Sequence, residues 1–214
     1  MREYPKIHTI YKRSPENRTL LEGQFSLPEF EYLANNIWTF TEKVDGTNIR
    51  VCYKGTCGHF VTFGGKTDNA QIPAKLANNL MNTFTQNLME SVFHDMDVIL
   101  YGEGYGAGIQ SGLGYRKEQS FVLFDVLVYS PDPIWLKRGD VEDVAEKLGY
   151  IEVVPVVEYG SLWSAIELAN KGFKSKWGNF TAEGLVAKPN IELKDRLGNR
   201  IMAKIKHRDF KMNR

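Results

Sequence analysis

Lys43 lies in a short segment whose residue types can support covalent chemistry. The segment TEKVDGTNIRV (residues 41–51) brings a lysine, an aspartate and a glycine together at the start of a strand-like run. A free lysine has a pKa of about 10.4 and is a poor nucleophile, but desolvation or cationic neighbours lower the pKa of such an amine. Asp45 can bind a metal or orient the lysine, and Gly46 permits a tight turn with close backbone approach to a ligand. Alone, a Lys-x-Asp-Gly string is more often a turn that carries a surface ion pair.

Two later segments place acidic residues at or within apolar strands. The segment YGEG (residues 101–104) ends an apolar run and holds Glu103 between two glycines. Asp125 follows Phe124 inside another apolar run, where a buried carboxylate is costly without a partner. Both acids are therefore candidates for a functional role.

The C-terminal part of the chain adds an acid and a series of lysines. Glu183 and Lys188 lie near opposite ends of EGLVAKP (residues 183–189). Because side chains alternate along a strand, Lys204 and Lys206 project to the same face, where they repel each other unless an anion lies between them. A triphosphate is such an anion. The net charge of the whole chain is only +1, but its C-terminal end is basic and suits contact with phosphates.

Taken in order, these segments resemble the nucleotidyltransferase motifs of the covalent ligase and capping-enzyme superfamily. The matching residues are Lys43-x-Asp45-Gly46, Glu103, Phe124-Asp125, Glu183-Gly184 with Lys188, and Lys204-x-Lys206. Each piece is weak alone, but five pieces in this order with compatible spacing are a specific signal.

The resemblance implies a role for each of these residues. Lys43 would attack the α-phosphate of ATP and hold AMP as a phosphoramidate, with Asp45 in the same catalytic motif. Glu103 would bind the ribose hydroxyls, and Phe124 would stack on adenine. Glu183 would bind a divalent metal, Mg²⁺ or Mn²⁺, through water. The side chains that would neutralise the phosphates, during both binding and catalysis, are Lys188, Lys204 and Lys206.

The run K-V-D-G-T-N is similar to the RNA ligase 2 group within this superfamily. DNA ligases typically carry Arg at the position of Asn48, and Arg50 comes two residues too late to replace it. RNA-ligase relatives usually carry Arg where this chain has Lys66, which keeps the charge but loses the bidentate fork. Glu42 lies next to the nucleophile, and the resemblance implies that it contacts the adenine edge. The nucleotide-binding set thus includes Glu42, Asn48 and Lys66.

The resemblance implies an ATP-dependent RNA ligase that forms a lysyl-AMP intermediate and joins 3′-OH to 5′-phosphate ends, as RNA repair requires. Its partner would be nucleic acid with such ends, RNA being favoured. Two alternatives stay open: a minimal ATP-dependent DNA ligase, and a catalytically inactive relative that binds nucleotides or nucleic acid. The glycine-rich YGEGYGAG does not indicate a dinucleotide-binding fold, because no helical period follows it.

Short strand-like segments dominate the elements that must position these residues. They are rich in β-branched and aromatic residues and are bounded by Gly, Pro, Asn or Asp. These segments are residues 48–55, 59–65, 97–104, 120–129, 151–160, 183–189 and 199–207. Apolar residues at helical spacing predict helices over residues 73–93, 141–150 and 161–172. The sequence therefore predicts an α+β fold with largely antiparallel sheets and flanking helices. The resemblance implies that this fold is the nucleotidyltransferase (ATP-grasp-like) ligase catalytic domain.

We expect residues 1–214 to form a single nucleotidyltransferase domain, the adenylyltransferase domain only. The eight residues after Lys206 leave no room for a C-terminal OB-fold or helical domain, so a protein partner that replaces it is an expectation. No run approaches the roughly 18 to 20 apolar residues of a membrane span, and no signal-peptide pattern begins the chain. Two cysteines cannot build a disulfide framework, which favours the cytoplasm.

Overall fold

The computed structural model describes residues 2–110 and 114–211 and divides into two compact units. Unit 1 comprises the described residues of Met1–Tyr4 and Asp45–Val154, and unit 2 comprises those of Pro5–Val44 and Pro155–Arg214. The chain passes from unit 2 to unit 1 between Val44 and Asp45, inside the segment that carries Lys43.

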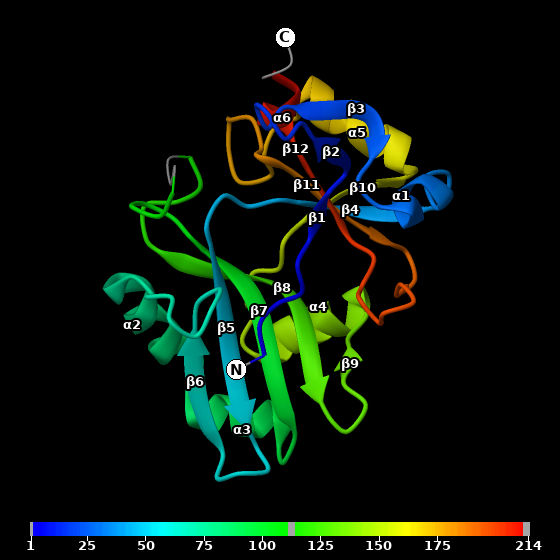
Figure 1. Cartoon of the computed structure of the whole chain (residues 1–214). Helices are drawn as coiled ribbons and strands as arrows, with labels where there is room; N and C mark the ends of the chain where they lie inside the picture. Colours follow the sequence, from blue (N-terminus) through cyan, green and yellow to red (C-terminus); the bar gives the residue numbers. More distant parts are fainter. Residues whose placement is uncertain (1, 111–113, 212–214) are drawn as a thin grey trace. The chain divides into compact units, whose positions relative to one another are not determined.

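Unit 1 is built on a five-stranded antiparallel sheet with the strand order β6-β5-β7-β8-β9 (Figure 1). The strands are β5 (Thr47–Lys54), β6 (Phe60–Gly64), β7 (Asp97–Tyr105), β8 (Ser120–Tyr129) and β9 (Ile134–Trp135). The helices are α2 (Ala74–Thr83), α3 (Gln86–Phe93) and α4 (Arg138–Lys147).

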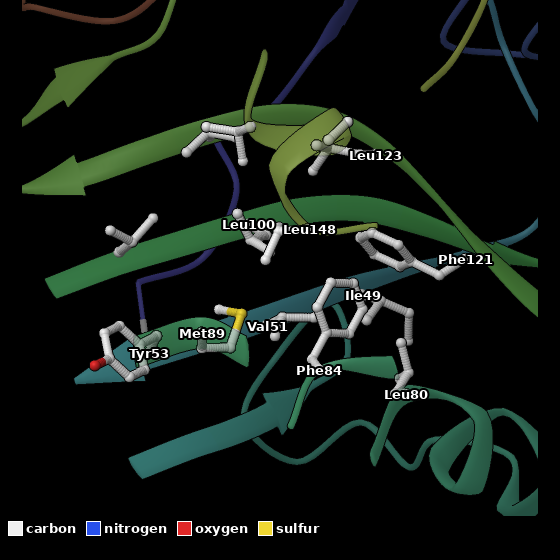
Figure 2. Packing of buried hydrophobic residues seen from close by; sticks show 14 of the residues in the cluster. Ile49, Val51, Tyr53, Leu80, Phe84, Met89, Leu100, Phe121, Leu123 and Leu148 are labelled. Atoms are coloured by element: carbon white, nitrogen blue, oxygen red, sulfur yellow. The ribbon is translucent and has the colours of Figure 1, made fainter. Parts of the chain in front are cut away.

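All three helices of unit 1 cover the same face of its sheet. Alternate residues of β5, such as Ile49 and Val51, point toward them and are fully buried. Figure 2 shows these two side chains packed with Leu80, Phe84 and other residues of the helices and of β7 and β8. The intervening residues of β5 therefore lie on the opposite face of the sheet.

The stretch predicted as one helix over residues 73–93 forms two helices. Thr85 separates α2 from α3, and its side-chain oxygen accepts a hydrogen bond from the backbone N–H of Leu88 at 3.3 Å. A threonine that caps the first turn of a new helix begins that helix at a fixed residue. The break was not predicted, because both helices bury the same kind of apolar stripe.

Unit 2 is built on a second five-stranded sheet with the order β1-β12-β11-β4-β10 (Figure 1). Its strands are β1 (His8–Thr9), β4 (Trp38–Glu42), β10 (Val156–Gly160), β11 (Gly184–Pro189) and β12 (Ala203–Lys206). Only β1 and β12 pair in parallel; the other neighbours in this sheet are antiparallel. The unit also contains the hairpin β2 (Tyr11–Arg13) and β3 (Leu20–Phe25), and the helices α1 (Pro28–Tyr32), α5 (Leu162–Lys171) and α6 (His207–Lys211).

Helix α5 covers one face of this sheet, with its own Leu162, Ala165 and Ala169 packed against apolar residues of β4, β11 and β12. Its limits follow the predicted ones. Ser161 caps its start, and Gly172 ends it with a φ of 81°, a conformation that favours glycine.

Two predicted strands are shorter in the structure. The segment at 151–160 becomes a strand only from Val156, after Pro155, and Val153 makes an isolated bridge to Leu123. The segment at 199–207 is a strand only over Ala203–Lys206. The α+β class with largely antiparallel sheets is confirmed. No helix among the described residues is long and apolar enough to cross a membrane.

Candidate functional site

Lys43, Glu183 and Lys206 form a charged cluster in unit 2. The Nζ of Lys43 lies 2.6 Å from Oε2 of Glu183, and the Nζ of Lys206 lies 2.6 Å from Oε1 of the same carboxylate. The three side chains are between 10% and 21% exposed, so the cluster is partly shielded and still reachable from solvent. One carboxylate thus holds two ammonium groups in place.

The register of three neighbouring strands brings these residues together. Gly184 of β11 pairs with Lys206 of β12, and the backbone N–H of Lys43 donates to the carbonyl oxygen of Gly184 at 2.9 Å. On the other side, the backbone N–H of His207 donates to the carbonyl oxygen of Glu183 at 2.9 Å. The ends of β4, β11 and β12 therefore meet at the cluster.

Two further lysines lie on the same face of this sheet. Lys204 pairs with Val186, and Lys188 pairs with Thr39, on the side opposite the apolar residues that pack against α5. The charged residues described here on this face of unit 2 are thus four lysines and one carboxylate, a surplus of positive charge that suits a polyphosphate.

Glu42 lies on the opposite face of β4 from Lys43, with the buried residues of that strand. Its side chain is 1% exposed and accepts hydrogen bonds from Oγ of Ser175 at 2.6 Å and from the backbone N–H of Lys176 at 2.8 Å. Burial raises the pKa of the Glu42 carboxyl, and the two hydrogen bonds oppose that rise. The structure therefore does not bring Glu42 to the lysine cluster but uses it to hold the 175–176 segment.

Asn48 and Glu103 lie side by side in unit 1, on the sheet face that the helices do not cover. They are register partners on β5 and β7. The Oδ1 atom of Asn48 is buried and has no hydrogen-bond partner among the described residues. An orphaned buried acceptor of this kind is costly and is expected where a ligand completes the hydrogen bonding.

Gly46 lies against β7 at the same place. A Cβ at Gly46 would lie 2.7 Å from Cγ of Glu103 and would overlap the carbonyl oxygen of Gly104. Glycine is therefore required here by the close approach of β7. The predicted approach of Gly46 to a ligand stays a prediction.

Phe124 and Asp125 reach the same sheet face through a β-bulge. Tyr101 pairs with Asp125 and Gly102 pairs with Leu123, so Phe124 is the extra residue. The ring of Tyr4 meets Phe124 at a centroid distance of 4.9 Å, and its hydroxyl donates to Asp125 at 2.5 Å. Asp125 thus has the partner that its burial requires.

The backbone of Asp45 and the segment that carries Lys66 are fixed by hydrogen bonds that the sequence did not predict. The backbone N–H of Asp45 donates to the hydroxyl of the buried Tyr115 at 3.0 Å. Lys66 is exposed in the segment after β6, which Arg50 anchors by hydrogen bonds to the Gly65 carbonyl oxygen at 2.7 Å and to Asp68 at 2.9 Å.

The structure therefore groups the predicted residues within each unit. Unit 2 brings together Lys43, Glu183, Lys188, Lys204 and Lys206 on one sheet face. Unit 1 places Asn48, Glu103 and Phe124 on one face of its own sheet. The supporting residues that sequence reasoning missed are Tyr4, Tyr115 and Ser175, and no local pattern marks any of them.

Comparisons with known proteins identify the family and the fold. The family model described as RNA ligase matches residues 36–206. Solved structures of an RNA ligase from Naegleria gruberi superpose on the chain: a mutant with AMP and Mn, at 17% identity and a TM-score of 0.68, and a mutant with ATP and Mn, at 19% and 0.66. These matches cover 98% and 96% of this chain, but only 60% and 64% of the Naegleria chains. A search of curated protein sequences found no match.

The chain shares its fold with the Naegleria gruberi RNA ligase, because the superpositions extend over nearly the whole chain. The family match covers most of the sequence and includes every residue of the two groups above. The chain belongs to the RNA ligase family.

Proposed function

We propose that this chain is an ATP-dependent RNA ligase that carries AMP on Lys43 and joins 3′-OH to 5′-phosphate ends. The observation that carries the proposal is the cluster in which Glu183 holds Lys43 and Lys206, on a sheet face that also presents Lys188 and Lys204. A nucleophilic amine surrounded by cations is what transfer of a nucleotidyl group requires.

In the first step, the Nζ of Lys43 attacks the α-phosphorus of ATP. A nitrogen–phosphorus bond forms, the bond to the bridging oxygen of the β-phosphate breaks, and pyrophosphate leaves. The proton that the amine gives up is within reach of Glu183 Oε2, 2.6 Å away. Lys206 and the two lysines beside it stabilise the charge on the departing phosphates.

Three residues on the sheet face of unit 1 that the helices do not cover fit the nucleoside part of ATP. Asn48 Oδ1 is a buried acceptor without a partner among the described residues, and a ribose hydroxyl supplies the missing donor. Glu103, its register neighbour, accepts from the second hydroxyl, and Phe124 offers an aromatic ring to the base. The Naegleria gruberi RNA ligase has been solved with ATP and with AMP, which supports the same ligand here.

A divalent metal would be held by the Glu183 carboxylate together with the phosphates of the substrate. Among the described residues there is no group of three or more His, Cys, Asp or Glu that could hold a metal alone. Mg²⁺ commonly binds through one or two carboxylates, several waters and substrate phosphates, so one carboxylate suffices. The metal, Mg²⁺ or Mn²⁺, would supply further charge neutralisation at the phosphates.

A sealing assay tests the proposal against the minimal DNA ligase and the inactive relative. The protein is mixed with ATP, Mg²⁺ and a panel of 5′-phosphorylated ends that carry RNA or DNA on the 3′-OH side. We expect joined product, or a 5′-adenylylated end, when the 3′-OH strand is RNA. Joining that requires DNA at both ends would favour the DNA ligase, and neither product with any end would favour the inactive relative.

A further inference from the structure

A cavity of about 780 Å³ lies in unit 2 at the C-terminal end of α5. Its walls come from the end of α5, from two short paired segments around residues 173–175 and 180–182, and from α6. The volume falls within the range of roughly 300 to 1,000 Å³ that is usual for small-ligand sites, so a nucleotide fits it.

The charge of the cavity is positive. Lys171, Lys174 and Lys211 line it and are exposed, whereas Glu167 is the one acidic residue among the described residues of its wall. Three flexible cations around one concave site raise the local concentration of an anion. This lining suits phosphate groups rather than an apolar ligand.

Two aromatic side chains complete the wall. Phe173 and Phe180 are half-buried and line the same cavity as the lysines. The backbone N–H of Ala182 donates to the carbonyl oxygen of Phe173 at 3.0 Å, and that of Ser175 donates to the carbonyl oxygen of Phe180 at 2.9 Å, so the two rings are carried by paired segments. Cations interleaved with aromatic rings are the usual means of binding single-stranded nucleic acid, in which bases stack on rings and cations meet phosphates.

His207 connects this cavity to the lysine cluster. It follows Lys206 directly, and its backbone N–H donates to the Glu183 carbonyl oxygen at 2.9 Å. Its Nδ1 donates to the carbonyl oxygen of Ala169 at 2.8 Å, because a carbonyl can only accept. That bond fixes the ring at the cavity wall and leaves Nε2 for a ligand.

Glu42 supplies a second connection. The residue immediately before Lys43 holds Ser175 and Lys176, which belong to the segment next to Lys174. The same strand end therefore carries the nucleophile on one face and anchors the cavity wall on the other.

We propose that this cavity binds a nucleotide of a single-stranded RNA end, with its lysines on the phosphates and an aromatic ring on a base. The inference rests on the proposed function, because it assigns a substrate subsite to the same enzyme.

The test compares two triple variants in binding to a short, fluorescently labelled, 5′-phosphorylated RNA. The cavity variant carries Lys171→Gln, Lys174→Gln and Lys211→Gln. The control variant carries Lys12→Gln, Lys194→Gln and Arg196→Gln, which remove the same charge from exposed positions of unit 2 outside the cavity wall. We expect the cavity variant to bind at least about tenfold more weakly than the wild type. The slope of the logarithm of the binding constant against the logarithm of the salt concentration should fall in magnitude by about 2 if three phosphate contacts are lost. The control variant is expected to stay within about threefold of the wild type, a difference of less than about 0.7 kcal/mol in binding.

An equal loss in both variants, or wild-type affinity in the cavity variant, would overturn the inference. Free AMP as a competitor distinguishes a strand from a mononucleotide: displacement of the RNA by AMP from the wild type but not from the cavity variant would also contradict the RNA assignment. If the triple variant melts at a lower temperature, the three single variants take its place, and each is expected to weaken binding about two- to threefold.

Formation of lysyl-AMP by the wild type is measured in parallel without RNA. If the wild type forms lysyl-AMP and the cavity variant binds RNA with wild-type affinity, the subsite is refuted and the proposed function stands. An inactive wild type would refute the proposed function, while the binding comparison would still decide the cavity.

Discussion

Glu183 contacts Lys43 and Lys206 through different carboxylate oxygens, each at 2.6 Å. Strand pairing fixes this arrangement, because the three residues lie at the adjoining ends of β4, β11 and β12. A substrate phosphate that enters the cluster competes with Glu183 for the same two ammonium groups. Under the proposed function, the carboxylate that these ammonium groups leave would become available to a divalent metal.

Replacing Lys206 should slow the transfer of AMP strongly. In Lys206→Ala, the phosphates lose one cation and Glu183 is left with Lys43 alone, so we expect the initial rate of enzyme adenylylation to fall about 100- to 1,000-fold. Lys206→Arg keeps the charge and should retain more of the rate, and Lys147→Ala, at an exposed position of α4, should change it little. A rate for Lys206→Ala within about threefold of the wild type would show that Lys206 does not act on the phosphates.

Glu42 should make the stability of the protein depend on pH. Burial raises the pKa of Glu42 in the folded protein above its unfolded value of about 4.5. Its contribution to the free energy of unfolding is therefore greatest below pH 4.5 and is lost as pH rises through the pKa of the folded state. Wild type should therefore lose stability relative to Glu42→Gln as pH increases above this point. Urea unfolding of both proteins over a pH series measures the difference.

Glu146→Gln, at an exposed position of α4, is the matched control for that series and should follow the wild type. A difference between Glu42→Gln and wild type that stays constant with pH, or that grows in the opposite direction, would contradict the burial argument.

At the scale of elements, the alternation of side chains along a strand correctly predicted that Lys204 and Lys206 lie on the same face of β12. The helical spacing of apolar residues over 161–172 predicted α5, and the structure adds the cap at Ser161. The split at Thr85 and the bulge at Phe124 depend on packing against other strands and helices, which no local pattern shows. For the same reason, the sequence placed Glu42 beside its neighbour Lys43, whereas β4 turns the two side chains to opposite faces.

Gly46→Ala tests the close approach of β7 to the start of β5. The added methyl group would overlap the Gly104 carbonyl and press on Glu103, so we expect the free energy of unfolding to fall by about 1–3 kcal/mol. Gly139→Ala is the control, because a Cβ there meets nothing within 4 Å and the residue lies in the first turn of α4. Equal stability of Gly46→Ala and wild type in urea unfolding would show that the two strands can separate at no cost.

At the scale of the whole molecule, the chain crosses between its two units inside the Lys43 segment, which leaves Lys43 in unit 2 and Asp45 in unit 1. The chain also begins in unit 1, through Tyr4, before it enters unit 2 at Pro5. The fold class was predicted from the sequence, and the roles of the residues in both groups stay a prediction. This alternation was not predicted, because it depends on contacts between residues far apart in the chain. The single-domain limits of 1–214 stay a prediction.

Tyr4 should contribute measurably to the stability of unit 1. Tyr4→Phe keeps the ring against Phe124 but removes the donor to the buried Asp125, and we expect a loss of about 1–2 kcal/mol. Tyr32→Phe, at a side chain that is 87% exposed, serves as the control in the same thermal and urea unfolding experiments. No loss in Tyr4→Phe relative to this control would mean that Asp125 is satisfied without the tyrosine.

The most direct test of the account is to locate AMP on the protein. Wild type and Lys43→Arg are incubated with ATP and Mg²⁺, and their peptides are analysed by mass spectrometry under conditions that preserve phosphoramidates. We predict an AMP adduct on the wild-type peptide that contains Lys43 and no adduct in Lys43→Arg. An adduct on another lysine that persists in Lys43→Arg, or no adduct on the wild type, would contradict the assignment of Lys43 as the nucleophile.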